Sequence, residues 1–144
     1  MNNKIMNNSI SPETLEKLTD DKDWEVRARV AENPKTPVKL LEKLAGDKDW
    51  MVRESAAQHK NTSPETLKKL AQDEEWFVRA RVAQHKNTSP ETLKKLAQDR
   101  SFFIRKQVAK NKYISHGILV KLTWDEDWEV RESAEKNLLK RNKI

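Results

Sequence analysis

Apolar residues recur along this chain in a single pattern that repeats every 26 positions. In each unit, two leucines three positions apart precede a polar stretch, and an aromatic residue, a valine or isoleucine and small residues follow it. The aromatic position recurs without one insertion or deletion as Trp24, Trp50, Trp76, Phe102 and Trp128. A fixed period of this length predicts a repeat architecture, in which each unit is one supersecondary element.

Each unit predicts two short helices, which the third unit shows most clearly. Its first helix begins at Ser63, a preferred N-cap residue followed by proline, and Leu67 and Leu70 share one face. Its second helix begins at the acidic residue before the aromatic, and Val78 and Val82 form its apolar side. Helices this short are marginal alone in water, so stability has to come from the stacking of units. The sequence therefore predicts an all-α fold, a short right-handed α-solenoid of five two-helix repeats whose second helices are either 3₁₀ or short α-helices.

The repeat also predicts the domain organisation. A five-repeat helical solenoid covers residues 10–139, preceded by a polar N-terminal segment at 1–9 and followed by a basic C-terminal tail at 140–144. The five units are 10–35, 36–61, 62–87, 88–113 and 114–139. Additional apolar residues lie near both ends of the chain. In the fifth unit, polar positions are replaced by Ile118, Val120, Leu138 and Leu139, and the first unit is preceded by Ile5 and Met6 and begins with Ile10. These residues either close the core at the terminal units or mark a dimer contact.

The composition excludes several kinds of site. No cysteine is present among the 144 residues, which rules out disulfides, thiolate zinc sites, cysteine-ligated iron–sulfur clusters and cysteine nucleophiles. The sequence shows neither a signal-peptide pattern nor an apolar run long enough to span a bilayer, so we expect a cytoplasmic protein without membrane association. The net charge of +6 permits attraction to polyanions, although 23 acidic residues are interleaved with the 29 basic ones.

Two columns of the repeat carry opposite charges in every unit. An aspartate lies six positions before an arginine, and this pair recurs five times. Such a row could bind anions, but a carboxylate and a guanidinium also form bidentate pairs that join a unit to itself or to its neighbour. Because the pair is present in every unit, including both ends, we assign it to a structural ladder. Its members are Asp21, Arg27, Asp47, Arg53, Asp73, Arg79, Asp99, Arg105, Asp125 and Arg131.

The combined pattern resembles a known family of repeat proteins. The run from Asp21 to Asn33 holds the tryptophan, Val-Arg and Val-Ala elements of the unit, and a Thr-Pro or Ser-Pro step with two leucines follows. In this form the unit resembles the leucine-rich repeat variant, and its aspartate–arginine spacing is similar to that of HEAT repeats. The resemblance implies an all-helical solenoid with short helices in alternation, whose second helices line the concave face. It leaves the function open, and without cysteines no iron–sulfur role is implied.

The column after the aromatic residue changes character along the chain. It is acidic in the two end units, at Glu25 and Glu129, and apolar in the three central ones. A position used only for packing has no reason to change in this way, and the same helix face continues with polar and basic residues. An apolar stripe with polar edges is typical of an interaction patch, although these side chains could also fold onto neighbouring units. The predicted patch consists of Met51, Phe77, Phe103, Ser55, Arg81, Gln107, Gln58, Gln84 and Lys110.

Three other columns are assigned to structure or solvent. The aromatic column could stack bases, but a residue at this position more often packs against the preceding helix, in the core or at its edge. The lysine of each first helix faces away from the leucines and is expected in solvent. His59 and His85 share a column, but adjacent solenoid helices lie about 8–10 Å apart, too far for their rings to share a metal.

The residues favour a binding or scaffold function over catalysis. With no catalytic triad, Gly-rich loop or metal cluster in the pattern, we expect a non-catalytic module without cofactor, metal or iron–sulfur cluster. Its expected partner is a protein, bound through the second-helix face of the central repeats. The alternative is a nucleic-acid-binding protein that uses the lysine and arginine rows. A HEAT-like DNA glycosylase would be the enzymatic form of that alternative, by analogy of fold alone.

Overall fold

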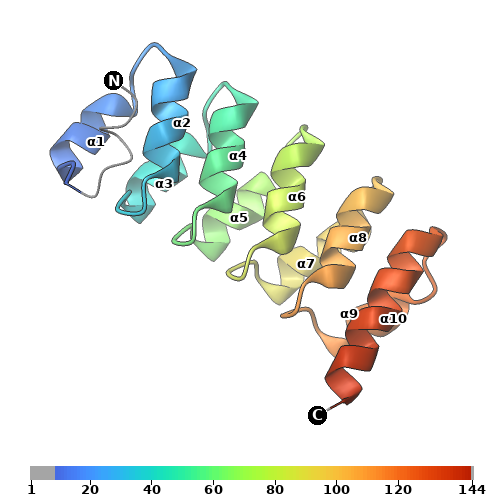
Figure 1. Cartoon of the computed structure of the whole chain (residues 1–144). Helices are drawn as coiled ribbons and strands as arrows, with labels where there is room; N and C mark the ends of the chain where they lie inside the picture. Colours follow the sequence, from blue (N-terminus) through green and yellow to red (C-terminus); the bar gives the residue numbers. More distant parts are fainter. Residues whose placement is uncertain (1–8, 144) are drawn as a thin grey trace.

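The computed structural model describes residues 9–143, which form ten α-helices in one extended stack (Figure 1). The first helices of the units are α1 (Pro12–Leu18), α3 (Val38–Leu44), α5 (Pro64–Leu70), α7 (Pro90–Leu96) and α9 (His116–Leu122). The second helices are α2 (Trp24–Glu32), α4 (Trp50–Gln58), α6 (Trp76–Gln84), α8 (Phe102–Lys110) and α10 (Trp128–Asn142). No strand occurs in this part of the chain, and the prediction of an all-helical solenoid is confirmed.

The helices lie in two layers. The second helices stand side by side in Figure 1, with α3, α5, α7 and α9 behind them. Each second helix packs directly against the second helices of the neighbouring units, whereas a first helix packs mainly against second helices. The second helices therefore form a continuous surface, here called the second-helix layer, that runs the whole length of the stack.

Local capping determines where the first helices begin. In four units the N-cap is a serine whose hydroxyl accepts a hydrogen bond from a backbone N–H three residues later. These serines are Ser11, Ser63, Ser89 and Ser115. In the second unit the N-cap of α3 is Pro37, which has no side-chain acceptor, so this helix begins without a cap bond.

The second helices begin at the aromatic residue, one position after the predicted acidic start. Asp23, Asp49 and Asp127 are N-caps that accept the backbone N–H two residues later, while Glu75 and Ser101 occupy the same place without a side-chain bond. In the first four units these are regular α-helices of nine residues, so the short α-helix is the correct one of the two predicted alternatives. Bonds of the 3₁₀ type instead close the C-terminal turns of the first helices.

The core is a row of buried aliphatic side chains between the two layers. Leucines of the first helices meet the valine or isoleucine column of the second helices, and Leu41, Leu67, Val52, Val78 and Ile104 are completely shielded from solvent. Burial of each such side chain contributes about 1.5–3 kcal/mol relative to exposure. Because these contacts extend from one unit to the next, the stack is the stable element and a single helix pair is not.

The apolar residues predicted to close the ends of the core divide into two groups. Those that pack against it are Ile10, Ile118 and Leu138. Those that remain exposed are Val120 and Leu139, so the capping prediction is wrong for these two. Ile5 and Met6 lie outside the described residues. At the C-terminal boundary of the predicted solenoid, the sequence predicts a basic tail for residues 140–142, but these residues form the last turn of α10.

Candidate binding surface

An ion-pair ladder joins consecutive units of the stack. Arg27 donates through Nε and Nη2 to the two carboxylate oxygens of Asp47 at 2.7 and 3.0 Å, and through Nη1 to the backbone oxygen of Asp21. The same arrangement recurs at the next three junctions, where the Nε–Oδ2 distances are 2.7, 2.8 and 2.8 Å. The four pairs are Arg27–Asp47, Arg53–Asp73, Arg79–Asp99 and Arg105–Asp125. Each arginine thus reaches the carboxylate of the following unit and only the backbone of its own.

Pairing keeps Arg27 and Asp47 ionised in spite of their burial. The hydrogen bond to Asp47 raises the pKa of Arg27, and burial opposes that rise without cancelling it. Burial also acts to raise the pKa of Asp47, but hydrogen bonds from Arg27 and from the backbone N–H of Asp49 outweigh it, and the pKa is lowered overall. At the C-terminal end of the described residues the ladder stops at Arg131, which donates to backbone oxygens of the preceding turn.

A second set of hydrogen bonds joins the C-terminal ends of the second helices. The Nε2 atom of His59 lies 2.9 Å from the carbonyl oxygen of Asn33, and that of His85 lies 2.8 Å from the carbonyl oxygen of His59. Because a carbonyl oxygen only accepts, both rings carry their proton on Nε2, and Nδ1 accepts a backbone N–H from Asn61 or Asn87. Burial lowers the pKa of both histidines, and nearby lysines lower it further against the opposing backbone bond. The column therefore holds neutral imidazoles as links between units.

Aromatic side chains form a row across the first turns of α4, α6 and α8. The ring of Phe77 stacks on Trp50 and Trp76 at centroid distances of 5.2 and 3.8 Å, and Trp76 meets Phe103 edge-on at 5.2 Å. Phe77 is nevertheless 38 % exposed and Trp76 42 % exposed. The expectation that the aromatic column lies in or beside the core is wrong for Trp76, Phe102 and Trp128, of which Phe102 is 43 % and Trp128 62 % exposed. Trp50 is covered by the phenyl ring of the next unit, and the described chain contains no unit after Trp128.

The predicted patch occupies one face of α4, α6 and α8, in three different settings. At the first turn, Met51 and Phe103 are half-buried, and Phe103 packs against the core. In the middle, each residue bonds across a unit junction, in the pairs Ser55–Glu32 at 3.4 Å, Arg81–Glu54 at 2.9 Å and Gln107–Gln84 at 2.9 Å. Of these three predicted patch residues, Gln107 is buried. At the last turn, the exposed residues are Gln58, Gln84 and Lys110. Ring stacking thus partly buries the side chains at the first turn, and the residues of the last turn are the most accessible part of the predicted patch.

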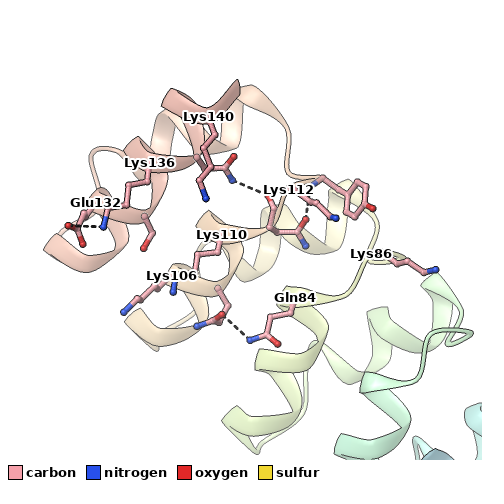
Figure 2. A pocket seen from close by; sticks show the side chains of 13 residues that line it. Gln84, Lys86, Lys106, Lys110, Lys112, Glu132, Lys136 and Lys140 are labelled. Atoms are coloured by element: carbon pink, nitrogen blue, oxygen red, sulfur yellow. Dashed lines mark hydrogen bonds and ion pairs between the residues drawn. The ribbon is translucent and has the colours of Figure 1, made fainter. Parts of the chain in front are cut away.

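A groove lies on the second-helix layer over the last three units. It has a volume of about 940 Å³ and extends across α6, α8 and α10 and the turns that follow α6 and α8 (Figure 2). Six lysines line it, namely Lys86, Lys106, Lys110, Lys112, Lys136 and Lys140. Glu132 is the one carboxylate of the lining, and four amide side chains, Ser133 and Tyr113 complete it. We call this site the lysine groove.

Most ammonium groups of the lysine groove have no anionic partner in the structure. Lys136 pairs with Glu132 at 3.1 Å, and Lys106 pairs with Glu129 at the next junction. The lysines of the lining that lack a carboxylate oxygen within 4.0 Å among residues 9–143 are Lys86, Lys110, Lys112 and Lys140. Figure 2 shows Lys106 and Lys110 on α8 opposite Lys136 and Lys140 on α10, with Lys86 at the margin. Within residues 9–143, four of the six lysines of the groove therefore carry a positive charge that no carboxylate neutralises.

Only three residues of the predicted patch line the lysine groove, namely Gln84, Gln107 and Lys110. Ser55 and Gln58 instead line a smaller hollow of about 460 Å³ beside Glu32. The lysines of the fifth unit were missed, although one column of the sequence indicates them. That column reads Glu32, Gln58, Gln84, Lys110 and Lys136, so it changes from acidic through neutral to basic along the chain.

The described side chains of the second-helix layer offer charged and hydrogen-bonding groups. Among residues 9–143, no three histidine or carboxylate side chains gather as metal ligands. The same part of the chain contains no helix with both the length and the apolar character needed to cross a membrane. The lysine groove and the aromatic row are the two features of the second-helix layer that stacking alone does not require.

Comparison with known proteins gives a consistent picture. Three consecutive segments, residues 24–49, 50–75 and 76–101, match the family model described as leucine rich repeat variant, and together they cover more than half of the chain. A solved structure described as "a leucine-rich repeat variant with a novel repetitive protein structural motif" is similar, with a TM-score of 0.73 and 32% sequence identity. The match covers 92% of this chain and 53% of the other, so this chain spans about half the length of that structure. No curated protein matches the sequence.

Proposed function

Because this chain belongs to the leucine-rich repeat variant family of helical repeat proteins, we propose that it is a non-catalytic module that binds a protein partner along its second-helix layer. A repeat protein of this kind fits a scaffold or interaction role, since its stacked units present one long surface. The aromatic row and the lysine groove lie on that surface, at opposite ends of the second helices.

The main evidence for this proposal is that the second-helix layer has surface side chains that the stacking of units does not require. Stacking uses the leucine and valine columns and the arginine–aspartate ladder, which are nearly constant from unit to unit. The columns that vary lie at the surface of the same layer, where partly exposed aromatic rings adjoin polar groups. Aromatic residues with a polar surround are enriched at protein interfaces and supply much of the binding energy.

A pair of matched variants tests this proposal. A partner is captured from cell extract, identified, purified and titrated by calorimetry against the wild type and two double variants. Gln58→Glu with Gln84→Glu places negative charge on the second-helix layer, where both residues are exposed. Gln72→Glu with Gln98→Glu makes the same chemical change at exposed positions after the first helices. We expect the first variant to weaken binding roughly tenfold or more and the second to leave it unchanged.

Nucleic-acid binding is the competing function, and the lysine groove is the observation in its favour. Duplex and single-stranded DNA are titrated at low and physiological salt. Affinity that falls steeply with salt, together with a failure of every purified protein candidate, would replace the protein partner by a nucleic acid. The carboxylates of Glu32 and Glu54, further along the layer, oppose a long phosphate track.

A further inference from the structure

The lysines of the groove are not explained by the stability of the helices. Cations near a helix C-terminus interact favourably with the helix dipole, and Lys110 lies in the last turn of α8. Yet the same column holds Glu32, Gln58 and Gln84 in α2, α4 and α6, which end in the same way. Helix termination therefore does not require a lysine at this position, and the presence of a lysine there in the last two units has another reason.

The dimensions of the lysine groove suit a short extended segment. It crosses three neighbouring second helices, whose axes in packed helices are about 8–10 Å apart, so the lysines span roughly 20 Å. An extended chain advances about 3.3 Å per residue, so about six residues fit this length. The concave lining brings several ammonium groups to the same segment and concentrates their field.

The amides of the groove match a peptide backbone. The side chain of Gln84 donates through Nε2 to Oε1 of Gln107 at 2.9 Å. This bond leaves the Gln84 oxygen as an acceptor and the amide N–H groups of Gln107 as donors, and of the two residues Gln84 is exposed and Gln107 is largely buried. A peptide unit offers both an N–H and a C=O, whereas a phosphate diester offers acceptors alone. Both amides line the groove between the lysines of α8 and the end of α6.

The charge pattern along the layer also favours a short acidic segment over a nucleic acid. Toward the N-terminal units, Glu54 and Glu32 take the place of the lysines, and inside the groove Glu132 stands among them. A nucleic-acid strand long enough to leave the groove would meet these carboxylates, since it carries a charge at every nucleotide. A peptide can confine its acidic residues to the six that lie over the lysines.

We infer that the lysine groove binds an extended acidic peptide segment, whose carboxylates pair with Lys110, Lys112, Lys136 and Lys140 and whose backbone bonds to Gln84 and Gln107. This inference rests on the proposed function, because the segment belongs to the protein partner. It specifies the chemistry by which that partner is recognised and the repeat units that recognise it.

The test uses a hexaglutamate peptide as the probe and the whole chain as the receptor. Lys110→Gln with Lys136→Gln installs in the groove the residue that the same column holds as Gln58 and Gln84. The control, Lys68→Gln with Lys94→Gln, removes the same charge from exposed positions of α5 and α7. At low salt we expect the groove variant to bind the peptide about 3- to 30-fold more weakly than the wild type and the control to bind it equally well. Circular dichroism confirms that each variant is folded.

Three comparison ligands make the outcome specific. Hexaglutamine tests whether the carboxylates are needed, a six-nucleotide oligothymidylate tests phosphodiesters, and inorganic phosphate tests a small anion. The inference is overturned if the wild type does not bind hexaglutamate, if both double variants lose the same affinity, or if the oligonucleotide binds more tightly than the peptide. Amide chemical shifts supply a second measurement, since peptide binding must perturb α8 and α10 and leave α2 unchanged.

This test separates the two proposals. If the purified partner still binds the second-helix layer while hexaglutamate does not bind, the acidic segment is wrong and the proposed function stands. If hexaglutamate binds in the groove but no protein partner depends on the layer, the anion site stands alone and the protein-binding function is wrong.

Discussion

The two ends of the second-helix layer share one scaffold and differ in charge. At the N-terminal end, Glu32 lies beside Ser55 and Gln58 in a small hollow whose lining also includes Lys60, so one carboxylate faces one ammonium. At the C-terminal end, the same column contributes Lys110 and Lys136 to the lysine groove. The ladder of arginine and aspartate passes beneath both ends with nearly identical geometry. The constant columns thus build the surface, and the varying columns give each part of it a different charge.

The largest expected effect tests whether the scaffold is in fact the same at both ends. Arg53→Ala removes the guanidinium from a junction in the N-terminal half and Arg105→Ala does so in the C-terminal half, leaving Asp73 or Asp125 buried without its partner. Each variant is expected to lose roughly 3–5 kcal/mol of unfolding free energy, measured by urea denaturation. Arg131→Ala is the control, because Arg131 has only backbone acceptors, and it should cost about 1 kcal/mol. Unequal losses for Arg53→Ala and Arg105→Ala would show that the two halves are held together differently.

A smaller effect concerns the pH dependence of stability, and it should be confined to the second and third units. His59 and His85 have lowered pKa values in the folded chain, so the unfolded chain binds protons more readily. Stability from this source is complete above the ordinary histidine pKa of about 6.5 and is lost as the pH falls below it. The lowered carboxyl pKa of Asp47 or Asp125 takes effect only below about pH 4, so the two sources are separated.

The histidine effect has a natural control in the repeat itself. The same column holds Asn111 and Asn137 in the last two units, where the amides also bond across the junctions. His59→Asn with His85→Asn is expected to abolish the fall in unfolding free energy between pH 7 and pH 5 that the wild type shows. Amide hydrogen exchange should place the loss of protection in α4 and α6. A pH dependence that survives in the double variant would assign it to other groups.

The smallest expected effect transfers the charge of one end to the other. Glu32→Lys with Gln58→Lys gives the N-terminal hollow the two lysines that the column carries in the fourth and fifth units. We expect a second, weaker equivalent of hexaglutamate binding in calorimetry and a change in unfolding free energy below about 0.5 kcal/mol. Glu32→Gln with Gln58→Asn, which adds no lysine, is the control. Failure to gain the second site would mean that the amides and the turns of the lysine groove are needed besides its charge.

The fold could be read from the sequence to a large extent because each structural column is repeated. Leu67 and Val78 are buried as their spacing predicts, and Ser63 is the N-cap of α5. Rules based on neighbouring residues fail where a contact with another unit determines whether a side chain is buried. Trp50 is stacked by the ring of Phe77 from the next unit, whereas no ring among the described residues stacks on Phe102 or Trp128, and the position of each residue in its own helix contains no such information.

The candidate surface was recovered only in part. The change of Met51, Phe77 and Phe103 relative to the end units directs attention to the second-helix layer, and two of these side chains are half-buried. The lysine groove combines residues from three helices and two turns, and its lining is set by how far consecutive units rotate as they stack. No spacing along one helix determines that rotation.

The sequence by itself determined the repeat, its two helices, the apolar faces that meet in the core and the columns available for ion pairing. These follow from local rules of helix periodicity and capping that each unit satisfies alone. Only the tertiary structure decided that Arg27 reaches Asp47 in the next unit, and that the aromatic rings stack across junctions. It also brought Lys110 and Lys136 into one groove. The physical reason is that these contacts join atoms of different units, whose relative placement is the summed result of packing along the whole stack.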